Sequence, residues 1–493
     1  MTTMASPPRT WTSTQRLRPE LGYIPAISIA VLAFAIISAL AIEFSNQASW
    51  VIFTPLIVIG AVVGLWVVGR AVSGSPTAII SYLVLIVFIT DAQFRARGAG
   101  EIETDWQSAL KFALWVGAGV IGIANAPPLR SWIGRLGPLC WLTYATIAMI
   151  SASYAPTPAY AFGCAFALLC FLPFAVTLVT KLSEGQFLWT MTITLAVFLA
   201  AGWVVYYVNP QLGTSEFWTY NGIELRMCGI AGQANNLGAI CAKYLGAIFL
   251  LWLGGRCRLR YAFPLAALGV VTLSASDART GMIAVVIAAC VVLLARSFRA
   301  LVGATFASIA GLLAILTFSL RLDALGSHFS RSGDPTEVFT LTGRVEIWQF
   351  VWQKINERPL LGWGYNASKV ILPQYNGFQD NLMIDTAHNM LLQSLLSVGI
   401  IGTAPIIVLT IYLLFNLVYR PYPFRDLFFL VVIISAISDT SALGTTPTML
   451  TLLFIMASVM PQAPTRGQFA TSVKNFAARA TPEKTIASGS ALG

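Results

Sequence analysis

The chain has 493 residues, of which 57% are hydrophobic and only 10% are charged, and its formal net charge is +10. Soluble domains carry about 25% charged residues. This composition, with a mean hydropathy of +0.75, excludes a soluble protein and indicates an integral membrane protein. The basic residues lie in short segments between apolar runs, where they set membrane topology rather than bind nucleic acid. Seven cysteines without a C-x-x-C pair indicate neither a zinc site nor a disulfide framework.

Apolar runs of about 20 residues, the length at which a helix crosses a bilayer, recur along most of the chain. We predict an all-α polytopic membrane protein with about fourteen (12–14) transmembrane helices in a membrane domain at 24–461. A cytoplasmic tail at 1–23 precedes this domain, and a disordered cytoplasmic tail at 462–493 follows it. The predicted spans are 24–42, 51–69, 76–93, 106–124, 137–153, 159–180, 187–208, 236–254, 261–276, 279–296, 299–319, 392–417, 424–439 and 444–461.

The basic residues favour one orientation of these spans. If the N-terminus is cytoplasmic, 18 of the 30 lysines and arginines fall in inside segments, as the positive-inside rule requires. Both termini are then cytoplasmic, and 321–391 becomes a large periplasmic loop before the twelfth span. A loop of this length is usually functional or disordered, and its aromatic, Gly and Pro residues favour a functional one.

A helix is predicted inside this loop, from about Thr342 to Glu357, where Pro359 ends it. Four apolar residues recur at helical spacing and define its apolar face: Val345, Trp348, Trp352 and Ile355. Such a face either lies on the membrane surface or packs on the helix bundle.

The histidine His388 directly precedes the twelfth span. Asn389, Gln393 and Ser397 follow it at a spacing of four and form a polar stripe on one helix face. Because polar groups at membrane depth are costly, such a stripe faces a bundle interior or a wet cavity. The alternative is a solvated loop histidine above ordinary interhelical hydrogen bonds.

Three arginines lie in patterned outside segments. Arg279 begins the tenth span after a short turn, and a helix N-terminus with an arginine suits a phosphate; a contact with lipid headgroups or with Asp277 is the alternative. Arg344 lies in the first turn of the loop helix. Arg226 precedes the eighth span, which starts at Asn236.

Two further charges lie inside or near spans. Lys243 shares a helix face with Asn236, so it either helps to hold a lipid phosphate or extends towards the inner side. Asp439, near the outer end of the thirteenth span, is a candidate carboxylate for a site. The sequence has no Walker loop, nucleophile elbow or H-E-x-x-H motif, so we predict metal-independent chemistry that uses no nucleotide and no cofactor.

The chain resembles the O-antigen ligase and Wzy-type polysaccharide polymerase superfamily, and its exopolysaccharide polymerase members look nearest. The resemblance covers about 226–402. It rests on four motifs in this order: Arg279-Thr-Gly281, Gly343-Arg344 to Trp348, Pro359 to Asn366, and His388-Asn389 to Gly402.

The resemblance implies a multi-pass glycosyltransferase of the bacterial inner membrane with a periplasmic active site. Such an enzyme moves a glycan from a polyprenyl (undecaprenyl) diphosphate donor to a hydroxyl of a glycan or lipid-core acceptor. Chain-length regulators and export proteins are expected as further partners. His388 would be catalytic, with the diphosphate bound by Arg279, Arg344 and Arg226, and with support from Asp385, Asn389, Gln393 and Asn236.

The sequence departs from the family pattern at one point, because Asp277-Ala precedes Arg279 where a serine commonly stands directly before the arginine. Two other classes compete with this interpretation. A multispanning transporter or flippase of lipid-linked oligosaccharides would show repeated halves, which the single long loop disfavours. A peptidoglycan polymerase of the cell-division type would depend on an acidic loop residue such as Asp385 instead of His388.

Overall fold

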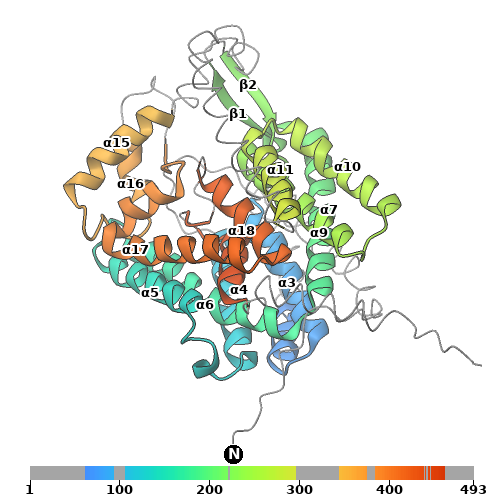
Figure 1. Ribbon diagram of the computed structural model, residues 1–493. Coiled ribbons are helices and arrows are strands. Elements are labelled where there is room, and N and C mark those ends of the chain that lie inside the picture. The colour runs from blue at the N-terminus through green and yellow to red at the C-terminus, as the bar shows by residue number, and fades with distance from the viewer. Residues whose placement is uncertain are drawn as a thin grey trace, which may run out of the picture.

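The computed structural model describes residues 62–93, 106–219, 222–295, 344–374, 384–437, 439, 442–444 and 446–460. These residues form a bundle of helices with one β-hairpin (Figure 1). The elements are α3 (Pro76–Asp91), α4 (Trp106–Asn125), η2 (Leu129–Ser131), α5 (Leu136–Ser151), η3 (Ala152–Tyr154), α6 (Pro158–Lys181), α7 (Glu184–Val208), α8 (Pro210–Gly213), β1 (Thr214–Thr219), β2 (Gly222–Met227), η4 (Gly229–Ala231), α9 (Ala234–Leu253), α10 (Leu259–Ala275), α11 (Arg279–Leu294), α15 (Arg344–Glu357), α16 (Ser368–Ile371), η6 (Leu372–Gln374), α17 (Met390–Tyr419), α18 (Pro423–Ala436) and α19 (Met449–Val459).

The predicted class, an all-α multi-pass membrane protein, is confirmed. In the part of the chain that the structure describes, six helices are long and apolar enough to cross a membrane, and several shorter apolar helices accompany them. One of these, α19, has 11 residues, and every one of them is buried, as expected for a helix that is apolar on all sides. The predicted spans 24–42 and 299–319 lie outside the described residues, so the count of fourteen stays a prediction.

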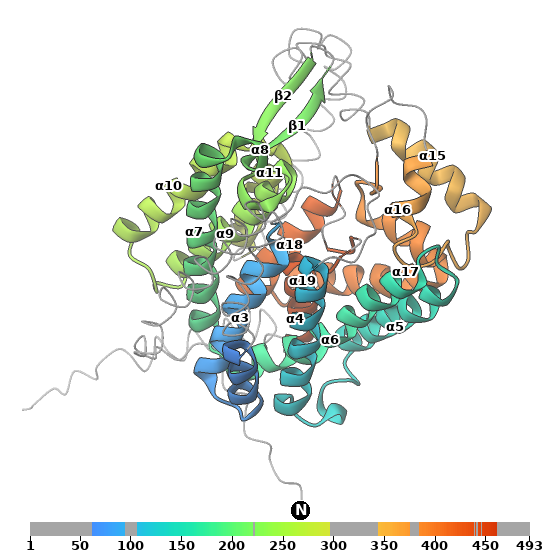
Figure 2. The same ribbon diagram turned by 180° about the vertical axis from the view of Figure 1, so that it is seen from behind.

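Part of the segment 209–235, which was predicted only as an outside connection between two spans, forms a β-hairpin. Strands β1 and β2 pair antiparallel, with Thr214 opposite Met227 and Thr219 opposite Gly222. In both views the hairpin projects from one end of the bundle, the same end at which α15 lies (Figures 1 and 2). A sequence signal existed, because Ile223, Leu225 and Met227 alternate with polar residues as in a strand.

The predicted loop helix is confirmed as α15, which ends at Glu357. Its predicted apolar face is wrong in part, because Trp352 is 52% exposed. The buried side chains are Ile347, Val351 and Ile355, spaced by four, and they pack with residues before and within α17 in a small second core. This face packs on the protein, so α15 is docked on the bundle next to His388.

Helix α17 is broken at Gly399, whose backbone is left-handed with φ 64°. The segment that follows α15 docks into this break. Ile400 N donates to Pro359 O at 2.9 Å, Trp363 N donates to Leu396 O at 2.9 Å, and Gly364 N donates to Ser397 O at 2.8 Å. Backbone groups that the break removes from the helix ladder therefore find partners in the loop.

This docking requires glycine at the contact. A Cβ atom on Gly399 would overlap the carbonyl of Leu360, and one on Gly362 would lie 2.7 Å from Ser397 O. Both glycines are also left-handed, which an L side chain adopts only with strain. The aromatic, glycine-rich motif thus fixes α15 against α17.

We expect Gly399→Ala to lower the free energy of unfolding by about 2–4 kcal/mol, because it adds backbone strain to a steric overlap. Unfolding of the purified protein in detergent, followed by circular dichroism, measures the change. Gly134→Ala is the matched control, since no atom lies within 4 Å of its added Cβ, and it should change stability by less than about 0.5 kcal/mol. Equal stability of the two variants would contradict the proposed packing.

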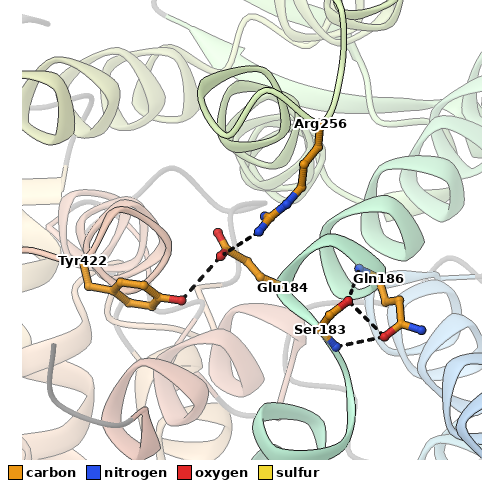
Figure 3. A network of polar contacts seen from close by, with 5 residues as sticks. All are labelled: Ser183, Glu184, Gln186, Arg256 and Tyr422. Atoms are coloured by element: carbon orange, nitrogen blue, oxygen red, sulfur yellow. Dashed lines mark hydrogen bonds and ion pairs between the residues drawn. The ribbon is translucent and has the colours of Figure 1, made fainter. Parts of the chain in front are cut away.

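A polar network joins three chain segments at the far end of α7 from the hairpin (Figure 3). Ser183 caps α7 in a reciprocal capping box with Gln186. The Glu184 carboxylate then accepts from Arg256 at 3.4 Å and from the Tyr422 hydroxyl at 3.5 Å. The contacts tie together the α6–α7, α9–α10 and α17–α18 connections, which are all predicted inside segments.

Candidate active site

One cavity of about 710 Å³ lies where the ends of six helices meet. The C-terminus of α3 and the N-terminal turns of α4, α6 and α9 line it, together with the residues before α17 and α19. The predicted alternation of spans places all six ends on the outer side. The polar and charged lining includes Asp91, Gln107, Ser108, Lys111, Tyr160, Gln233, Asn235, Asn236, Lys243, Lys369, Asp385, Thr386, His388, Asp439 and Thr448.

The electrostatics of this cavity suit a polar ligand with an anionic part. Five helices direct their N-termini at it, and each N-terminus carries a partial positive charge. Three lysines and three aspartates line the wall, so the side chains balance one another. The helix N-termini therefore make the cavity more favourable for anions than its side chains alone would.

His388 is held in one position by its neighbours. Its own backbone is left-handed, with φ 47°. Ala387 N donates to Gln393 Oε1 at 3.0 Å, and Ala387 O accepts from Trp348 Nε1 at 3.0 Å. Asn389 caps α17, with Oδ1 accepting from the N–H groups of the next turn.

The polar stripe faces the interior, as one of the two interpretations predicted. Gln393 and Ser397 are each 2% exposed. The Gln393 amide also donates to the Ser368 hydroxyl at 2.8 Å, and Asn389 Nδ2 donates to Ile437 O at 3.0 Å. The stripe orients the segment that carries His388.

The environment keeps His388 neutral. Burial, followed by the positive charge of Arg344, lowers the pKa of His388 from 6.5 to about 4. Arg344 at the start of α15 thus lies close enough to act on the imidazole. Burial raises the pKa of the nearby Asp385, while the charge of Lys369 opposes that shift.

Several residues in or beside the family motifs have left-handed backbone. In the described ranges, three non-glycine residues have this conformation, namely Asp277, Asn366 and His388. Asn366 and His388 lie in two of the segments on which the family resemblance rests, and Asp277 lies two residues before a third, where the sequence departs from the family pattern. Such a residue costs on the order of 1–3 kcal/mol and persists where the surrounding structure enforces it, often at functional sites.

Arg226 and Arg279 form a second cluster. The Arg226 guanidinium is buried and donates to the Ser276 carbonyl at 2.6 Å and to the Asp277 carbonyl at 2.8 Å. It also reaches Asn235, a cavity residue, at 3.5 Å. Arg226 therefore holds the turn that presents Arg279, and its direct contact with a diphosphate stays a prediction.

Arg279 is the first residue of α11, and its side chain is 44% exposed. Its Nε lies 3.7 Å from the Asp277 carboxylate. Close packing fixes the helix start, because a Cβ on Gly281 would lie 2.5 Å from the Gly238 carbonyl of α9. Arg279 itself does not line the cavity.

Lys243 does not extend towards the inner side, and its contact with a lipid phosphate stays a prediction. Its ammonium forms an ion pair with Asp91, and the two side chains are 2% and 5% exposed. The other Asp91 oxygen accepts from Met449 N at 3.1 Å, so the pair joins α3, α9 and α19. A sequence signal for this ion pair existed. Asp91 ends an apolar run, and a carboxylate at membrane depth needs a polar or charged partner.

The sequence analysis also missed Lys369 and Tyr160. The Lys369 ammonium lies 5.4 Å from the centre of the Tyr160 ring, and both line the cavity beside Asp385. Lys369 follows the glycine-rich loop and Tyr160 lies on α6, so the two meet only in the folded chain and no local pattern shows the contact. Among the described residues, no group of three or more His, Cys, Asp or Glu could hold a metal ion.

Residues 264–407 match the family model described as O-Antigen ligase. This segment includes Arg279, Arg344, His388 and the break at Gly399. The match confirms the resemblance to the superfamily that the motifs predicted.

A stretch of 171 residues is also 31% identical to a protein of Rickettsia felis that is provisionally named a polysaccharide ligase. The match covers 32% of this chain and 40% of that relative, so the chain spans less than half the length of the protein that it resembles.

Proposed function

We propose that the protein is an inner-membrane glycosyltransferase of the polysaccharide polymerase or O-antigen ligase type. It would transfer a glycan from polyprenyl diphosphate to an acceptor hydroxyl on the periplasmic side. The observation that carries this proposal is the placement of His388, which is neutral and rigidly held at a cavity ringed by helix N-termini. It lies inside the segment that matches the ligase family.

In the proposed reaction, the acceptor oxygen attacks the anomeric carbon of the donor sugar. The bond from that carbon to the diphosphate oxygen breaks, and polyprenyl diphosphate leaves with the electron pair. The imidazole of His388 accepts the hydroxyl proton, for which its neutral form is required. Arg344 and the helix N-termini stabilise the negative charge that develops on the leaving group.

The supporting residues keep this geometry. Gln393 and Asn389 fix the backbone on either side of His388. Asn236 and Asp385 line the cavity, where they would bind sugar hydroxyls. Arg279, on the turn held by Arg226, would bind a phosphate at the edge of the site.

A deletion strain tests the reaction class. Without the gene, single lipid-linked repeats should accumulate if the protein is a polymerase, whereas long lipid-linked chains should accumulate if it is a ligase. Electrophoresis of lipid-linked, surface and secreted glycans distinguishes the two outcomes, and wild-type complementation is the control. If lipid-linked glycans instead remain on the cytoplasmic face, the protein is a flippase and the proposal fails.

The proposed side of the membrane has its own test. Gln374 is exposed in the loop before the twelfth span, so Gln374→Cys should react with a membrane-impermeant maleimide on intact spheroplasts. Cys290, the exposed one of the seven cysteines, is first replaced by serine to remove background labelling. Labelling only after lysis would place the loop in the cytoplasm and reject the periplasmic site.

A further inference from the structure

The cavity extends along α4, away from the N-terminus of this helix. Its lining follows one face of α4, from Gln107 and Ser108 through Lys111 to Phe112 and Trp115. Trp115 is nine residues into the helix, which corresponds to a depth of about 13 Å. Along this face the side chains change from amide and hydroxyl through ammonium to aromatic rings.

Between α4 and α6, which pack side by side (Figure 2), residues that line the cavity also lie at the surface of the described part of the chain. Phe112 of α4 and Phe162 of α6 line the cavity and are 39% and 48% exposed. Gly163 lies between them without a side chain, and a Cβ there would touch the Phe112 ring at 3.6 Å. Both helices are candidate membrane spans, so an opening at this level would face lipid.

The walls of this opening are a continuous aromatic surface. Phe162 stacks on Phe166 with ring centres 6.2 Å apart, and Phe166 also contacts Phe112 at 6.4 Å. An apolar chain suits such a surface, whereas a sugar or a phosphate does not. The opening is therefore apolar at its outer edge and polar where it meets the cavity.

A buried polar atom supplies an independent sign of a ligand. Trp115 lines the cavity and is 4% exposed. Its Nε1–H has no hydrogen-bond partner within the described parts of the chain. An indole N–H is a donor only, and leaving it buried without an acceptor costs about 1–3 kcal/mol. An acceptor brought by a ligand would satisfy it, and Lys111 one turn away favours an anionic one.

We propose that the opening between α4 and α6 is the exit through which the polyprenyl chain of the donor leaves the cavity into the bilayer. Trp115 Nε1 donates to an oxygen of the lipid-linked phosphate, and Phe112 and Phe162 pack against the first isoprene units. The inference rests on the proposed function, because it concerns the tail of the proposed donor. The opening lies outside residues 264–407, the segment that matches the ligase family.

Photo-cross-linking locates the tail. Benzoylphenylalanine is placed at Phe162 in full-length protein in nanodiscs that contain a radiolabelled C55 polyprenyl diphosphate. The control position is Ile123, which is 75% exposed on α4 and does not line the cavity. We expect at least about tenfold more capture at Phe162, and unlabelled polyprenyl diphosphate should compete where excess phosphatidylglycerol does not. Equal capture at both positions would show ordinary lipid contact and overturn the proposal.

Trp115→Phe tests the hydrogen bond while it keeps a ring in place. The KM for the donor should rise about tenfold, the loss expected for one hydrogen bond to a charged acceptor, and the KM for the acceptor should stay unchanged. The control is Trp189→Phe, because the Trp189 Nε1 also has no partner among the described residues but lies away from the cavity. An equal rise in the control, or no rise in Trp115→Phe, would reject the role of Trp115.

The two proposals fail in different ways. If Phe162 captures no diphosphate lipid but His388→Ala abolishes transfer, the exit is wrong and the proposed function stands. If Phe162 captures the lipid and His388→Ala transfers normally, the exit stands and the assigned catalytic role fails.

Discussion

Replacing His388 by alanine is expected to reduce glycan transfer by about 10²–10⁴-fold, the range that a positioned general base supplies. The variant removes the proton acceptor and leaves in place Gln393 and Asn389, which fix the backbone on either side of position 388. Initial rates of the purified protein in nanodiscs, with a defined lipid-linked donor and with EDTA present, measure the loss. Strong inhibition of the wild type by EDTA would indicate a metal requirement and contradict metal-independent chemistry.

Two variants make this result specific. Gln374→Ala, at an exposed loop position, should transfer at the wild-type rate and controls for general damage to the loop. Asp385→Asn separates the competing enzyme class, because a peptidoglycan polymerase of the cell-division type would lose its essential carboxylate. Full activity of His388→Ala together with an inactive Asp385→Asn would exchange their roles.

Arg344→Met should reduce kcat/KM by about 10²–10³-fold, the loss expected when one electrostatic contact to the leaving group is removed. It should also change the pH dependence. The positive charge of Arg344 helps to lower the pKa of His388 to about 4, so its removal raises that pKa. Because the neutral imidazole is the active form, the acid limb of kcat/KM should begin near pH 4 in the wild type and lie at higher pH in Arg344→Met.

The same coupling predicts a difference between the two kinetic constants of the wild type. Bound diphosphate neutralises part of the charge on Arg344, so the pKa of His388 should be higher in the complex. The acid limb of kcat, which reports the complex, should then lie at higher pH than that of kcat/KM. Arg344→Lys keeps the positive charge but loses the planar fork of the guanidinium. The acid limb of kcat/KM in this variant should therefore stay near the pH of the wild type, while kcat/KM itself falls. An unmoved limb in Arg344→Met would show that the arginine does not act on His388.

Local patterns in the sequence predicted the parts of the structure that depend on neighbouring residues. Helical spacing and Pro359 predicted α15 and its end at Glu357. The spacing of Asn389, Gln393 and Ser397 predicted a stripe that turns inward. These features repeat with the period of a helix, so one stretch of chain is enough to show them.

Contacts between distant segments could not be read in this way. The partner of Lys243 is Asp91, which is 152 positions away, and Arg226 binds carbonyls about 50 positions away. The buried face of α15 was predicted at Trp348 and Trp352, one position away from the buried Ile347 and Val351. This face is covered in part by Leu396 of α17, and the course of α17 there depends on the break at Gly399. Asp and His are enriched among non-glycine residues with left-handed backbone, but whether Asp277 and His388 adopt it is decided by the surrounding structure.

The break in α17 also constrains how the protein is made. Carbonyl and amide groups around Gly399 would face hydrocarbon without partners if the Pro359–Gly364 segment were absent, and such exposure is not tolerated in a bilayer. The second half of this helix should therefore be stable in the membrane only after that segment has docked. A chain delayed at this stage would expose an incomplete helix to membrane proteases. If the loop lies on the periplasmic side, as proposed, its export would act as a checkpoint, and chains in which α17 persists would already carry His388 beside α15.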